Sequence, residues 1–486
     1  MKTIKKSISR RNFLASSGVA LAGGALINPF AQAGATPATI TMQQSSKTKL
    51  ALVGTGIRGI GAFGNSLIRR YPDKIEYVGL CDKNPGRVEA GKEIIGVNCP
   101  TYSDLNNPLS AFDKMMNERK PELVIVCTTD STHDDYIVRG MELGANIITE
   151  KPMATDERKI QRIIDAENRT GKKCLTAFNY RYSPLRAKMY ELLNAGEIGE
   201  LTSIDFNWYL DISHGADYFR RWHRLMDIGG SLWVHKACHH FDLLNWWIDS
   251  DPETVYALGA LEFYGKNGPF RAENCRTCPH IRQCQFYWQI ERPISDFVLE
   301  ASGIGEARPQ GPSLLRLLYI NNEHYDGYLR DGCVFKNDID IYDKMAATIK
   351  YMNGVQVSYS LTAYSPYEGY RIAFNGTKGR MDAWIEESNP VSDRDFDEIV
   401  LFKNFGRRQY IQIPHRSGHG GGDNLMRDQM FIPDSPDPLK QKAGVRDGSL
   451  ACLIGIAARR SIESGQPIKI ADMTSIKPQI KKQYAG

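Results

Sequence analysis

A short stretch near the middle of the chain places several acid–base side chains at helical spacing. His235, His239 and Asp242 follow one another at intervals of four and three residues, so a helix would carry them on one face. Histidine suits proton transfer because its ordinary pKa lies near physiological pH. Metal binding and a purely structural role both stay open, since an H-x-x-x-H helix can hold a metal ion and histidines can be buried in a core. Lys236 adds a cation to this set.

A second candidate site is a glycine-rich turn close to the N-terminus. An apolar run enters a turn in which Gly54, Gly56 and Gly59 have the G-x-G-x-x-G spacing of a dinucleotide site. The first glycine permits the tight turn, the second lets the backbone approach a pyrophosphate, and the third lets helix and strand pack closely. The phosphates would bind at the helix N-terminus, where free N–H groups favour negative charge. Ile57 and Arg58, between the glycines, are included among the expected cofactor contacts.

The acidic residue after the next expected strand bears on the choice of cofactor. A strand over 75–81 ends at Asp82, where a carboxylate can bind a ribose 2′-hydroxyl and would repel a 2′-phosphate. Asp82 therefore favours NAD over NADP, although Lys83 and Arg87 weaken this preference. The alternative is that Asp82 only caps the following turn.

Two further strands would end in polar residues. The continuous apolar run 123–127 is typical of a strand buried on both faces of a parallel sheet, and another strand is expected over 146–149. Ligands of such sheets bind outside the carboxyl ends of the strands. The expected cofactor contacts at these ends are Thr128, Thr129, His133, Glu150 and Lys151.

The first 33 residues have the pattern of an export signal. A twin-arginine sequence at 9–14 precedes a modest apolar stretch and a small-residue cleavage site at 31–33. The apolar stretch is short and interrupted by glycine, so no membrane span is expected; a disordered basic N-terminus is the alternative. This leader predicts a periplasmic or cell-envelope location. It also accounts for part of the net charge of +5, which therefore gives no reason to expect nucleic-acid binding.

With these features the mature chain resembles the Gfo/Idh/MocA family of oxidoreductases over nearly its whole length. The matching motifs are the GTGIRG turn, Asp82, the strand-end sequence TTDSTH, Glu150-Lys151-Pro152 and Asn179-Tyr180-Arg181-Tyr182. The resemblance implies an α/β fold with an N-terminal Rossmann domain. It also implies a C-terminal α+β domain with a large open, mainly antiparallel sheet.

The resemblance also implies roles for individual residues. Lys151 would lie near the nicotinamide and the substrate hydroxyl, where an ammonium group can stabilise alkoxide charge or relay a proton. His239 aligns with the histidine that handles the hydroxyl proton in the family pattern Asp-x-x-x-His. This chain departs from that pattern, because His235 stands where the aspartate would be and Lys236 follows it. We count all four as candidate catalytic residues, and the departure suggests a different substrate or step.

The segment 214–224, just before this helix, is crowded with aromatic, cationic and histidine side chains. A sugar site uses such groups, whereas an exposed helix with an aromatic stripe is the alternative. A glycine-rich loop expected over 415–423 could bring His419 and Asp423 over the site. The candidate substrate contacts are Tyr180, Arg181, Tyr218, Arg221, Trp222, His223 and His240.

The ten cysteines fall into two groups. Six are scattered, several of them in apolar strands, and fit the role of small buried hydrophobic residues. Cys275, Cys278 and Cys284 lie close together in an insertion over about 264–335, and Cys333 lies near its end. The four thiols could build a structural zinc site, could form the disulfides common in exported proteins, or could do neither. Folding before export, in a reducing compartment, favours zinc.

Four parts are predicted: a signal peptide over 1–33, a linker over 34–48, an NAD-binding Rossmann domain over 49–175 and a substrate and oligomerisation domain over 176–486. Strands beyond residue 202 alternate apolar and polar residues, which suits a sheet covered on one face. The family resemblance implies that this sheet pairs subunits into a homo-oligomer.

The expected activity is hydride transfer between a sugar, polyol or sugar derivative and tightly bound NAD, with NADP less favoured. Because free cofactor is scarce outside the cytoplasm, it would be loaded before export and restored in each cycle. The alternative is an NAD-dependent glycoside hydrolase that oxidises its sugar transiently, resembling NAD-dependent N-acetylgalactosaminidases. A sugar-binding protein without chemistry is disfavoured, because Lys151 and His239 are both present.

Overall fold

The computed structural model describes residues 47–290, 313–388, 395–415, 417–432 and 435–480. The predicted signal peptide and nearly all of the predicted linker lie outside these ranges. Within them, none of the helices combines the length and the apolar character that a membrane crossing requires.

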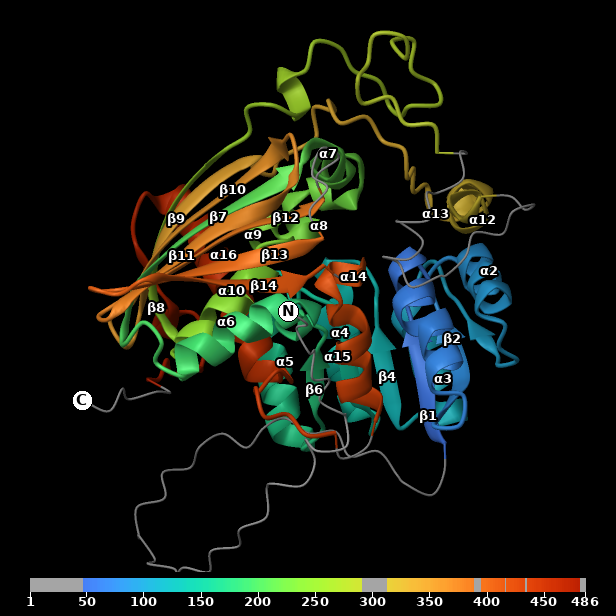
Figure 1. The fold of residues 1–486 in the computed structure, drawn as a ribbon. Coiled ribbons are helices and arrows are strands. Elements are labelled where there is room, and N and C mark those ends of the chain that lie inside the picture. The colour runs from blue at the N-terminus through green and yellow to red at the C-terminus, as the bar shows by residue number, and fades with distance from the viewer. Residues whose placement is uncertain (1–46, 291–312, 389–394, 416, 433–434, 481–486) are drawn as a thin grey trace, which may run out of the picture. The chain divides into compact units, whose positions relative to one another are not determined.

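The first half of the chain is built on a parallel sheet, sheet A, with strand order β3-β2-β1-β4-β5-β6 (Figure 1). Its strands are β1 (Thr48–Val53), β2 (Ile75–Cys81), β3 (Thr101–Tyr102), β4 (Leu123–Val126), β5 (Asn146–Thr149) and β6 (Cys174–Thr176). Its helices are the π-helix η1 (Gly59–Asn65), α1 (Ser66–Arg70), α2 (Pro85–Ile95), α3 (Pro108–Arg119), η2 (Asp130–Thr132), α4 (His133–Glu142) and α5 (Glu157–Thr170).

Both faces of sheet A are covered, as the apolar runs predict. Alternate residues of β1 enter different hydrophobic clusters, with Ala51 and Val53 in one and Leu50 and Leu52 in the other. β4 is buried along its whole length. The polar residues that follow the carboxyl ends of these strands lie where a ligand of a parallel sheet binds.

The second half is built on a nine-stranded sheet, sheet B, in the order β14-β13-β12-β11-β7-β10-β9-β8-β15. Its strands are β7 (Leu201–Asp211), β8 (Pro252–Ala260), β9 (Lys344–Tyr351), β10 (Gln356–Ser365), β11 (Glu368–Gly376), β12 (Gly379–Ser388), β13 (Phe396–Lys403), β14 (Arg408–Pro414) and β15 (Ile468–Lys469). Only β7 and β10 pair in parallel, and the other described neighbours are antiparallel. The predicted fold class, a Rossmann domain followed by a mainly antiparallel sheet, is confirmed.

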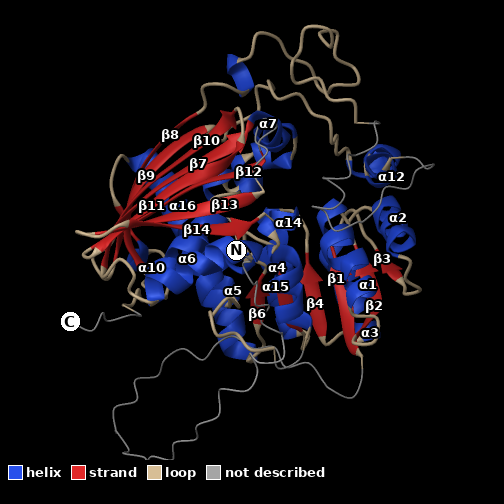
Figure 2. Ribbon diagram, in the orientation of Figure 1, coloured by secondary structure: helices blue, strands red, loops and turns tan. Residues whose placement is uncertain are grey.

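Helices cover one face of sheet B. Buried and exposed residues alternate strictly along β9, which is the pattern of a strand with one solvent face. The helices and short turns of this half are η3 (Asn179–Tyr182), α6 (Pro184–Asn194), α7 (Ile212–Arg220), η4 (Trp222–Arg224), α8 (Met226–Gly229), α9 (Ser231–His235), α10 (Cys238–Ile248), η5 (Gly265–Asn267), α12 (Leu314–Leu318), η6 (Ile320–Asn322), α13 (Glu323–Asp326), α14 (Ser417–Gly420), α15 (Gly422–Phe431), α16 (Val445–Ser464) and η7 (Ile470–Asp472). Figure 2 shows α10 and α16 along the sheet, and α16 packs on both β8 and α10.

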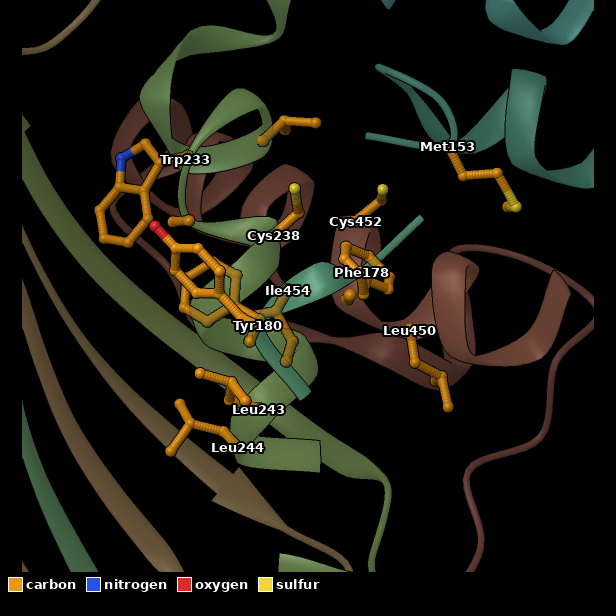
Figure 3. Packing of buried hydrophobic residues seen from close by; sticks show 14 of the residues in the cluster. Met153, Phe178, Tyr180, Trp233, Cys238, Leu243, Leu244, Leu450, Cys452 and Ile454 are labelled. Carbon is orange, nitrogen blue, oxygen red and sulfur yellow. The ribbon is translucent and has the colours of Figure 1, made fainter. Parts of the chain in front are cut away.

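The contact between α10 and α16 forms the centre of the larger hydrophobic cluster. Figure 3 shows the side chains that meet there, which are Cys238, Leu243 and Leu244 of α10 and Leu450, Cys452 and Ile454 of α16. Phe178 and Tyr180, which follow β6, enter the same cluster. This core holds α10 rigidly beside the end of sheet A.

The single helix predicted to carry His235, His239 and Asp242 is interrupted in the structure. α9 ends at His235, and α10 begins at Cys238 after a turn of two residues. His235 therefore lies on α9, whereas His239 and Asp242 lie on α10. The three side chains do not share one helical face.

A buried ion pair joins the end of sheet A to α10. Arg181, in η3, donates from Nε and Nη2 to the two carboxylate oxygens of Asp242 at 2.8 and 2.6 Å. Its Nη2 also lies 3.4 Å from Asp447. Arg181 and Asp242 are almost completely buried. The guanidinium of Arg181, predicted to bind substrate, faces these two carboxylates, and its role in substrate binding stays a prediction.

Replacing Arg181 by methionine removes the cation that both carboxylates face. We expect the free energy of unfolding to fall by about 3–5 kcal/mol, as for other broken buried ion pairs, in urea unfolding experiments. Arg139→Met is the matched control, because its pair with Asp113 is partly exposed and should contribute less than about 1 kcal/mol. Equal small losses in both variants would contradict the structural role of Arg181.

Candidate functional site

Lys151 lies at the carboxyl edge of sheet A and contacts the second half of the chain. Its Nζ donates to the backbone carbonyl of His235 at 3.0 Å and lies 3.4 Å from His235 Nε2. The carbonyl is available because the helix is interrupted there: the N–H of His239 donates to the carbonyl of Lys236 instead. The helix break therefore creates the binding position for the lysine head group.

His235 is oriented by a carboxylate that the sequence patterns do not single out. Its Nδ1 lies 2.5 Å from Asp130 Oδ2, and both side chains are buried. With Nδ1–H donating a hydrogen bond to this carboxylate, Nε2 is the unprotonated nitrogen and its lone pair is directed toward Lys151. Asp130, His235 and Lys151 thus form a hydrogen-bonded series across the junction of the two halves. Its position inside TTDSTH is a signal for Asp130, but nothing in that motif distinguishes it from its neighbours.

His239 lies against a tyrosine ring rather than in a hydrogen-bond network. The imidazole stacks on Tyr180 with ring centroids 4.2 Å apart. It makes an edge contact with Phe178, whose ring centroid lies 5.9 Å from its own. Its Nδ1 is buried without a hydrogen-bond partner among the described residues. A buried polar atom without a partner invites a ligand or a water, so His239 has an unused hydrogen-bonding position.

Burial and neighbouring cations set the protonation of this group. Burial lowers the pKa of Lys151, and burial together with the Lys151 ammonium holds the pKa of His235 well below its usual value. Burial, Lys151 and Lys236 do the same to the pKa of His239. Burial raises the pKa of Asp130, so Asp130 and His235 favour sharing one proton over forming an ion pair. Both imidazoles are therefore neutral at pH 7.

Lys236 has the opposite environment. Its Nζ donates to Tyr180 Oη at 3.0 Å and to Glu368 Oε1 at 3.4 Å. Burial lowers the pKa of Lys236, but the Glu368 carboxylate outweighs burial and the net shift is upward. Burial raises the pKa of Glu368, but His214 and Lys236 outweigh it and lower the value to about 2. Lys236 is thus a permanent cation beside Tyr180.

The glycine turn has the geometry that a dinucleotide requires. A Cβ on Gly54 would lie 2.4 Å from the carbonyl oxygen of Cys127, and one on Gly59 would lie 2.1 Å from that of Gly54. Gly54 also has a φ of 91°, which favours glycine. These two glycines are therefore required for the turn and for close helix packing. A Cβ on Gly56 would meet only the Tyr319 hydroxyl, at 3.3 Å, so Gly56 is the least enclosed of the three glycines.

Asp82 lies beside this turn at the end of β2. Its Oδ2 accepts hydrogen bonds from the N–H and the hydroxyl of Thr55 at 2.8 and 3.2 Å. Its Oδ1 accepts from Arg87 at 3.2 Å, and Arg87 also donates to Asp326 at 2.9 Å. A guanidinium held by two carboxylates is already neutralised.

Arg58 links the glycine turn to the catalytic candidates. Its Nε donates to Glu150 Oε1 at 2.6 Å, and its Nη2 lies 3.5 Å from Asp423. Glu150 in turn accepts from the N–H of Lys151 at 3.1 Å. The turn, the Glu150-Lys151 strand end and the segment around Asp423 are therefore brought together.

Two predicted site residues, His133 and His240, are buried. The ring nitrogens of His133 lie 2.8 Å from the carbonyl of Pro152 and 3.1 Å from that of Thr128, so His133 ties two strand ends together. His240 is fully buried, with Nδ1 2.8 Å from Tyr359 Oη. The assignments of His133 to cofactor contact and of His240 to substrate contact stay predictions. Thr128 and Thr129, both half-buried, remain at the carboxyl edge of β4.

The aromatic segment 214–224 does meet the catalytic candidates. Three aromatic rings surround the imidazole of His235. The distances between its centroid and those of Tyr218, Trp222 and His223 are 5.2, 5.8 and 4.1 Å. Arg221 donates from Nε to His223 Nδ1 at 3.2 Å and lies half-buried. These side chains surround His235, and Trp222 and Arg221 are the more accessible of them.

The predicted loop over 415–423 is wrong, because most of it is helical. α14 and the start of α15 occupy this stretch. His419 Nδ1 lies 2.7 Å from Asp423 Oδ2, and the His419 ring lies 5.9 Å from that of Tyr180. The segment therefore lies near Tyr180, and it is helical rather than a loop.

The four clustered cysteines line one small cavity. Cys275, Cys278, Cys284 and Cys333 surround it together with apolar side chains. All ten cysteines lie in described parts of the chain and are free, so the disulfide alternative is not supported. Within the ranges that the structure covers, no group of three or more histidine, cysteine or acidic side chains has the arrangement of a metal site.

Comparison with protein families matches two regions of the chain. Residues 48–178 match the oxidoreductase family NAD-binding Rossmann fold, and residues 190–394 match the oxidoreductase family C-terminal alpha/beta domain. Among solved structures, levoglucosan dehydrogenase in complex with NADH and L-sorbose aligns with a TM-score of 0.59. The alignment covers 87% of this chain and 99% of that one at 18% identity, so it shows the fold alone.

Three relatives span different shares of the chain. YteT of Bacillus subtilis (strain 168), which carries the name of an oxidoreductase, is 36% identical over 86% of this chain and 97% of its own length. Inositol 2-dehydrogenase of Salmonella typhimurium is 25% identical over 41% of this chain and 56% of its own. A glycosyl hydrolase family 109 protein of Porphyromonas gingivalis is 30% identical over 46% of this chain and 49% of its own.

The protonation of His239 can be tested without a substrate. We expect its imidazole to titrate below the usual histidine pKa in NMR spectra of histidine-labelled protein, because burial, Lys151 and Lys236 disfavour its charged form. Lys236→Met removes one of these cations, so the pKa of His239 should rise. His133 is the internal control, since the charges that affect its pKa are Glu150 and Lys151. A titration of His239 that Lys236→Met does not change would contradict the electrostatic description.

Proposed function

The chain belongs to the Gfo/Idh/MocA family of oxidoreductases, and on that premise we propose that it transfers hydride between a sugar, polyol or sugar derivative and NAD held at the glycine turn. The observation that carries the proposal is the convergence of Lys151 and His235 at the carboxyl edge of sheet A. Arg58 and Glu150 connect that convergence to the glycine turn.

The residues present fit a dinucleotide. Gly56 is the least enclosed glycine of the turn, and Asp82 offers carboxylate oxygens at the position of a ribose. When bound, the nicotinamide supplies the hydride acceptor or donor. The protein then has to bind the substrate hydroxyl, move its proton and exclude water.

Lys151 and His239 divide the handling of the hydroxyl proton. The Lys151 ammonium donates a hydrogen bond to the substrate oxygen and stabilises charge that develops on it. His239 is neutral and has an unused nitrogen, so it accepts the proton during oxidation and returns it during reduction. His235, held by Asp130, keeps Lys151 in place, and Lys236 contributes a fixed positive charge.

NAD is the proposed cofactor rather than NADP. A 2′-phosphate would meet the Asp82 carboxylate, which repels it. Arg87, which could otherwise attract the phosphate, is held by Asp82 and Asp326. Of the two cations that weaken the preference for NAD in the sequence, only Lys83 is left to attract a 2′-phosphate.

A redox-neutral glycosidase is the second candidate, favoured by the similarity to a glycosyl hydrolase family 109 protein. In that reaction the sugar is oxidised, the glycosidic bond is broken by elimination and water addition, and the sugar is reduced again. The His235-Lys236 pair, which replaces the aspartate of the family pattern, is compatible with either reaction.

One set of assays separates the two. The protein is incubated with NAD and a panel of aldoses, polyols, inositols and aryl glycosides, and nicotinamide absorbance and aryl release are recorded. Net NADH formation supports the dehydrogenase, whereas aryl release without net NADH supports the glycosidase. His239→Ala should slow either reaction about 10²- to 10⁴-fold, because it removes the acid–base group. His415→Ala is the control, because His415 lies in a partly exposed pair with Asp397. Equal rates in both variants would contradict the role of His239 as the acid–base group.

We propose export through the twin-arginine leader to the periplasm or cell envelope, with the cofactor already bound. Support comes from the sequence of the leader, since a twin-arginine signal implies export of a folded protein.

A homo-oligomer formed through sheet B is also proposed. Its solvent face carries Tyr256 and Leu258 of β8 and Trp384 of β12, three exposed apolar side chains.

For the four clustered cysteines we propose a structural zinc site. They already line one cavity. Backbone N–H groups donate to Cys278 Sγ and Cys333 Sγ at 3.4 Å, and the Arg220 guanidinium donates to Cys275 Sγ at 3.1 Å. Zinc is held by cysteine sulfur in such sites, and binding would draw the four sulfur atoms inward. Four thiolates leave no open coordination position, so the metal would be structural.

Metal analysis of the purified protein tests this site. About one zinc per chain is expected in the wild type, and Cys278→Ser should lower the zinc content and the thermal stability. Cys99→Ser, at a cysteine far from the cluster in sequence, should leave the zinc content unchanged. A wild-type protein without zinc would end the proposal.

A further inference from the structure

We infer that residues 313–330 form a roof over the nucleotide site that slows release of the cofactor, and that Tyr319 in this roof contacts the cofactor phosphates. The inference rests on the proposed binding of a dinucleotide at the glycine turn. The roof comprises α12, η6 and α13 and comes from the chain between β8 and β9, in the second half of the protein.

The roof touches the glycine turn through one hydroxyl. Tyr319 Oη accepts a hydrogen bond from the backbone N–H of Ile57 at 3.0 Å. A Cβ built on Gly56 would lie 3.3 Å from the same oxygen, so Tyr319 lies directly over the part of the turn that a pyrophosphate approaches. A tyrosine hydroxyl can both accept and donate. A phosphate oxygen that binds at the Ile57 N–H would take the place of the tyrosine oxygen there, and the hydroxyl would then donate to the phosphate.

The roof is also fastened at the ribose end of the site. Asp326 accepts from Arg87 Nη2 at 2.9 Å, while Arg87 Nη1 donates to Asp82 at 3.2 Å. Asn84 Nδ2 donates to the backbone carbonyl of Asn322 at 2.9 Å. The roof thus contacts the residues expected to bind ribose as well as the turn expected to bind pyrophosphate.

Apolar packing holds the roof closed. Leu315, Leu318 and Tyr319 are buried, and they share a hydrophobic cluster with Leu50 and Leu52 of β1. Lifting the roof would expose these side chains to water, which is unfavourable.

Ion pairs hold the other side of the roof to the second half of the chain. Arg330 donates to Asp217 of α7 at 2.7 Å. Arg276, in the cysteine-rich segment, donates to Glu323 of α13 at 3.0 and 2.7 Å. The roof is therefore held from both sides, and a dinucleotide beneath it can leave only after these contacts open.

The test measures cofactor retention in the mature full-length protein. Wild-type protein is purified and denatured, and the nicotinamide released is identified and quantified. In parallel, protein loaded with NADH is mixed with excess NAD, and the loss of NADH fluorescence gives the dissociation rate. Tyr319→Phe removes only the hydroxyl, and Asp326→Asn weakens the tie to Arg87. Tyr325→Phe is the matched control, because this tyrosine of the roof has an exposed side chain.

Wild type and Tyr325→Phe should purify with bound nicotinamide. Tyr319→Phe should release NADH roughly 10- to 100-fold faster, as expected for the loss of a hydrogen bond to a charged group. The double variant, which combines Tyr319→Phe with Asp326→Asn, should release it faster still. Hydrogen exchange should show that NAD protects residues 313–330 in the wild type. Circular dichroism and thermal unfolding establish that the variants are folded.

Dissociation at the wild-type rate from folded Tyr319→Phe and from the double variant would overturn the roof while leaving the proposed oxidoreductase intact. A wild-type protein that neither retains nor binds any nicotinamide would remove both proposals. Retention in the wild type and loss in the double variant, with turnover restored by added NAD, would support the roof independently of catalysis.

Discussion

The interruption between α9 and α10 is the constraint on which the site depends. A buried carbonyl group must find a donor, and the break leaves that of His235 outside the helical hydrogen-bond pattern. Lys151, from the other half of the chain, supplies the donor. The same change of direction presents the imidazole of His235 to Asp130 and sends Lys236 to the opposite side, toward Tyr180. One local departure from helical geometry thus positions both lysines and joins the two halves.

The two lysines show how surroundings assign different tasks to identical side chains. Burial lowers the pKa of Lys151, whose contacts are a carbonyl and an imidazole, so its proton is the more easily given up. Lys236 has Glu368 beside it, and the attraction keeps its charge. Burial, with both cations adding to it, holds the pKa of His239 well below its usual value, so His239 is neutral. A site with one mobile and one fixed positive charge can transfer a proton without losing its attraction for an oxyanion.

Local sequence is sufficient for the sheet and the glycine turn but not for the contacts between the halves. The glycine spacing and the apolar runs reflect constraints within a few residues, and the predicted fold class is correct for that reason. Asp130, Glu368 and Tyr319 act on residues 105, 132 and 262 positions away, so no local pattern singles them out. Spacing also cannot tell which way a side chain points, and His240 shows this, since it turns into the core beside His239.

The helix break and the helical segment over 417–423 escape prediction for related reasons. No glycine or proline marks the turn after His235, and it is the contact with Lys151 that stabilises it. Conversely, the glycines around His419 predict a loop, yet the bond between His419 and Asp423 and the contact with Arg58 support a helical turn. In both places a tertiary contact outweighs local propensity.

The distance along the chain between Ile57 and Tyr319, 262 residues, has a consequence for biosynthesis. A ribosome delivers the glycine turn long before the segment that covers it, and N-terminal regions generally fold first. If residues 313–330 cover the nucleotide site as proposed, a nascent chain that folds in this order would have its glycine turn formed before its cover. A dinucleotide that enters then is enclosed when the rest of the polypeptide folds, so the order of synthesis becomes the order of assembly of the holoenzyme.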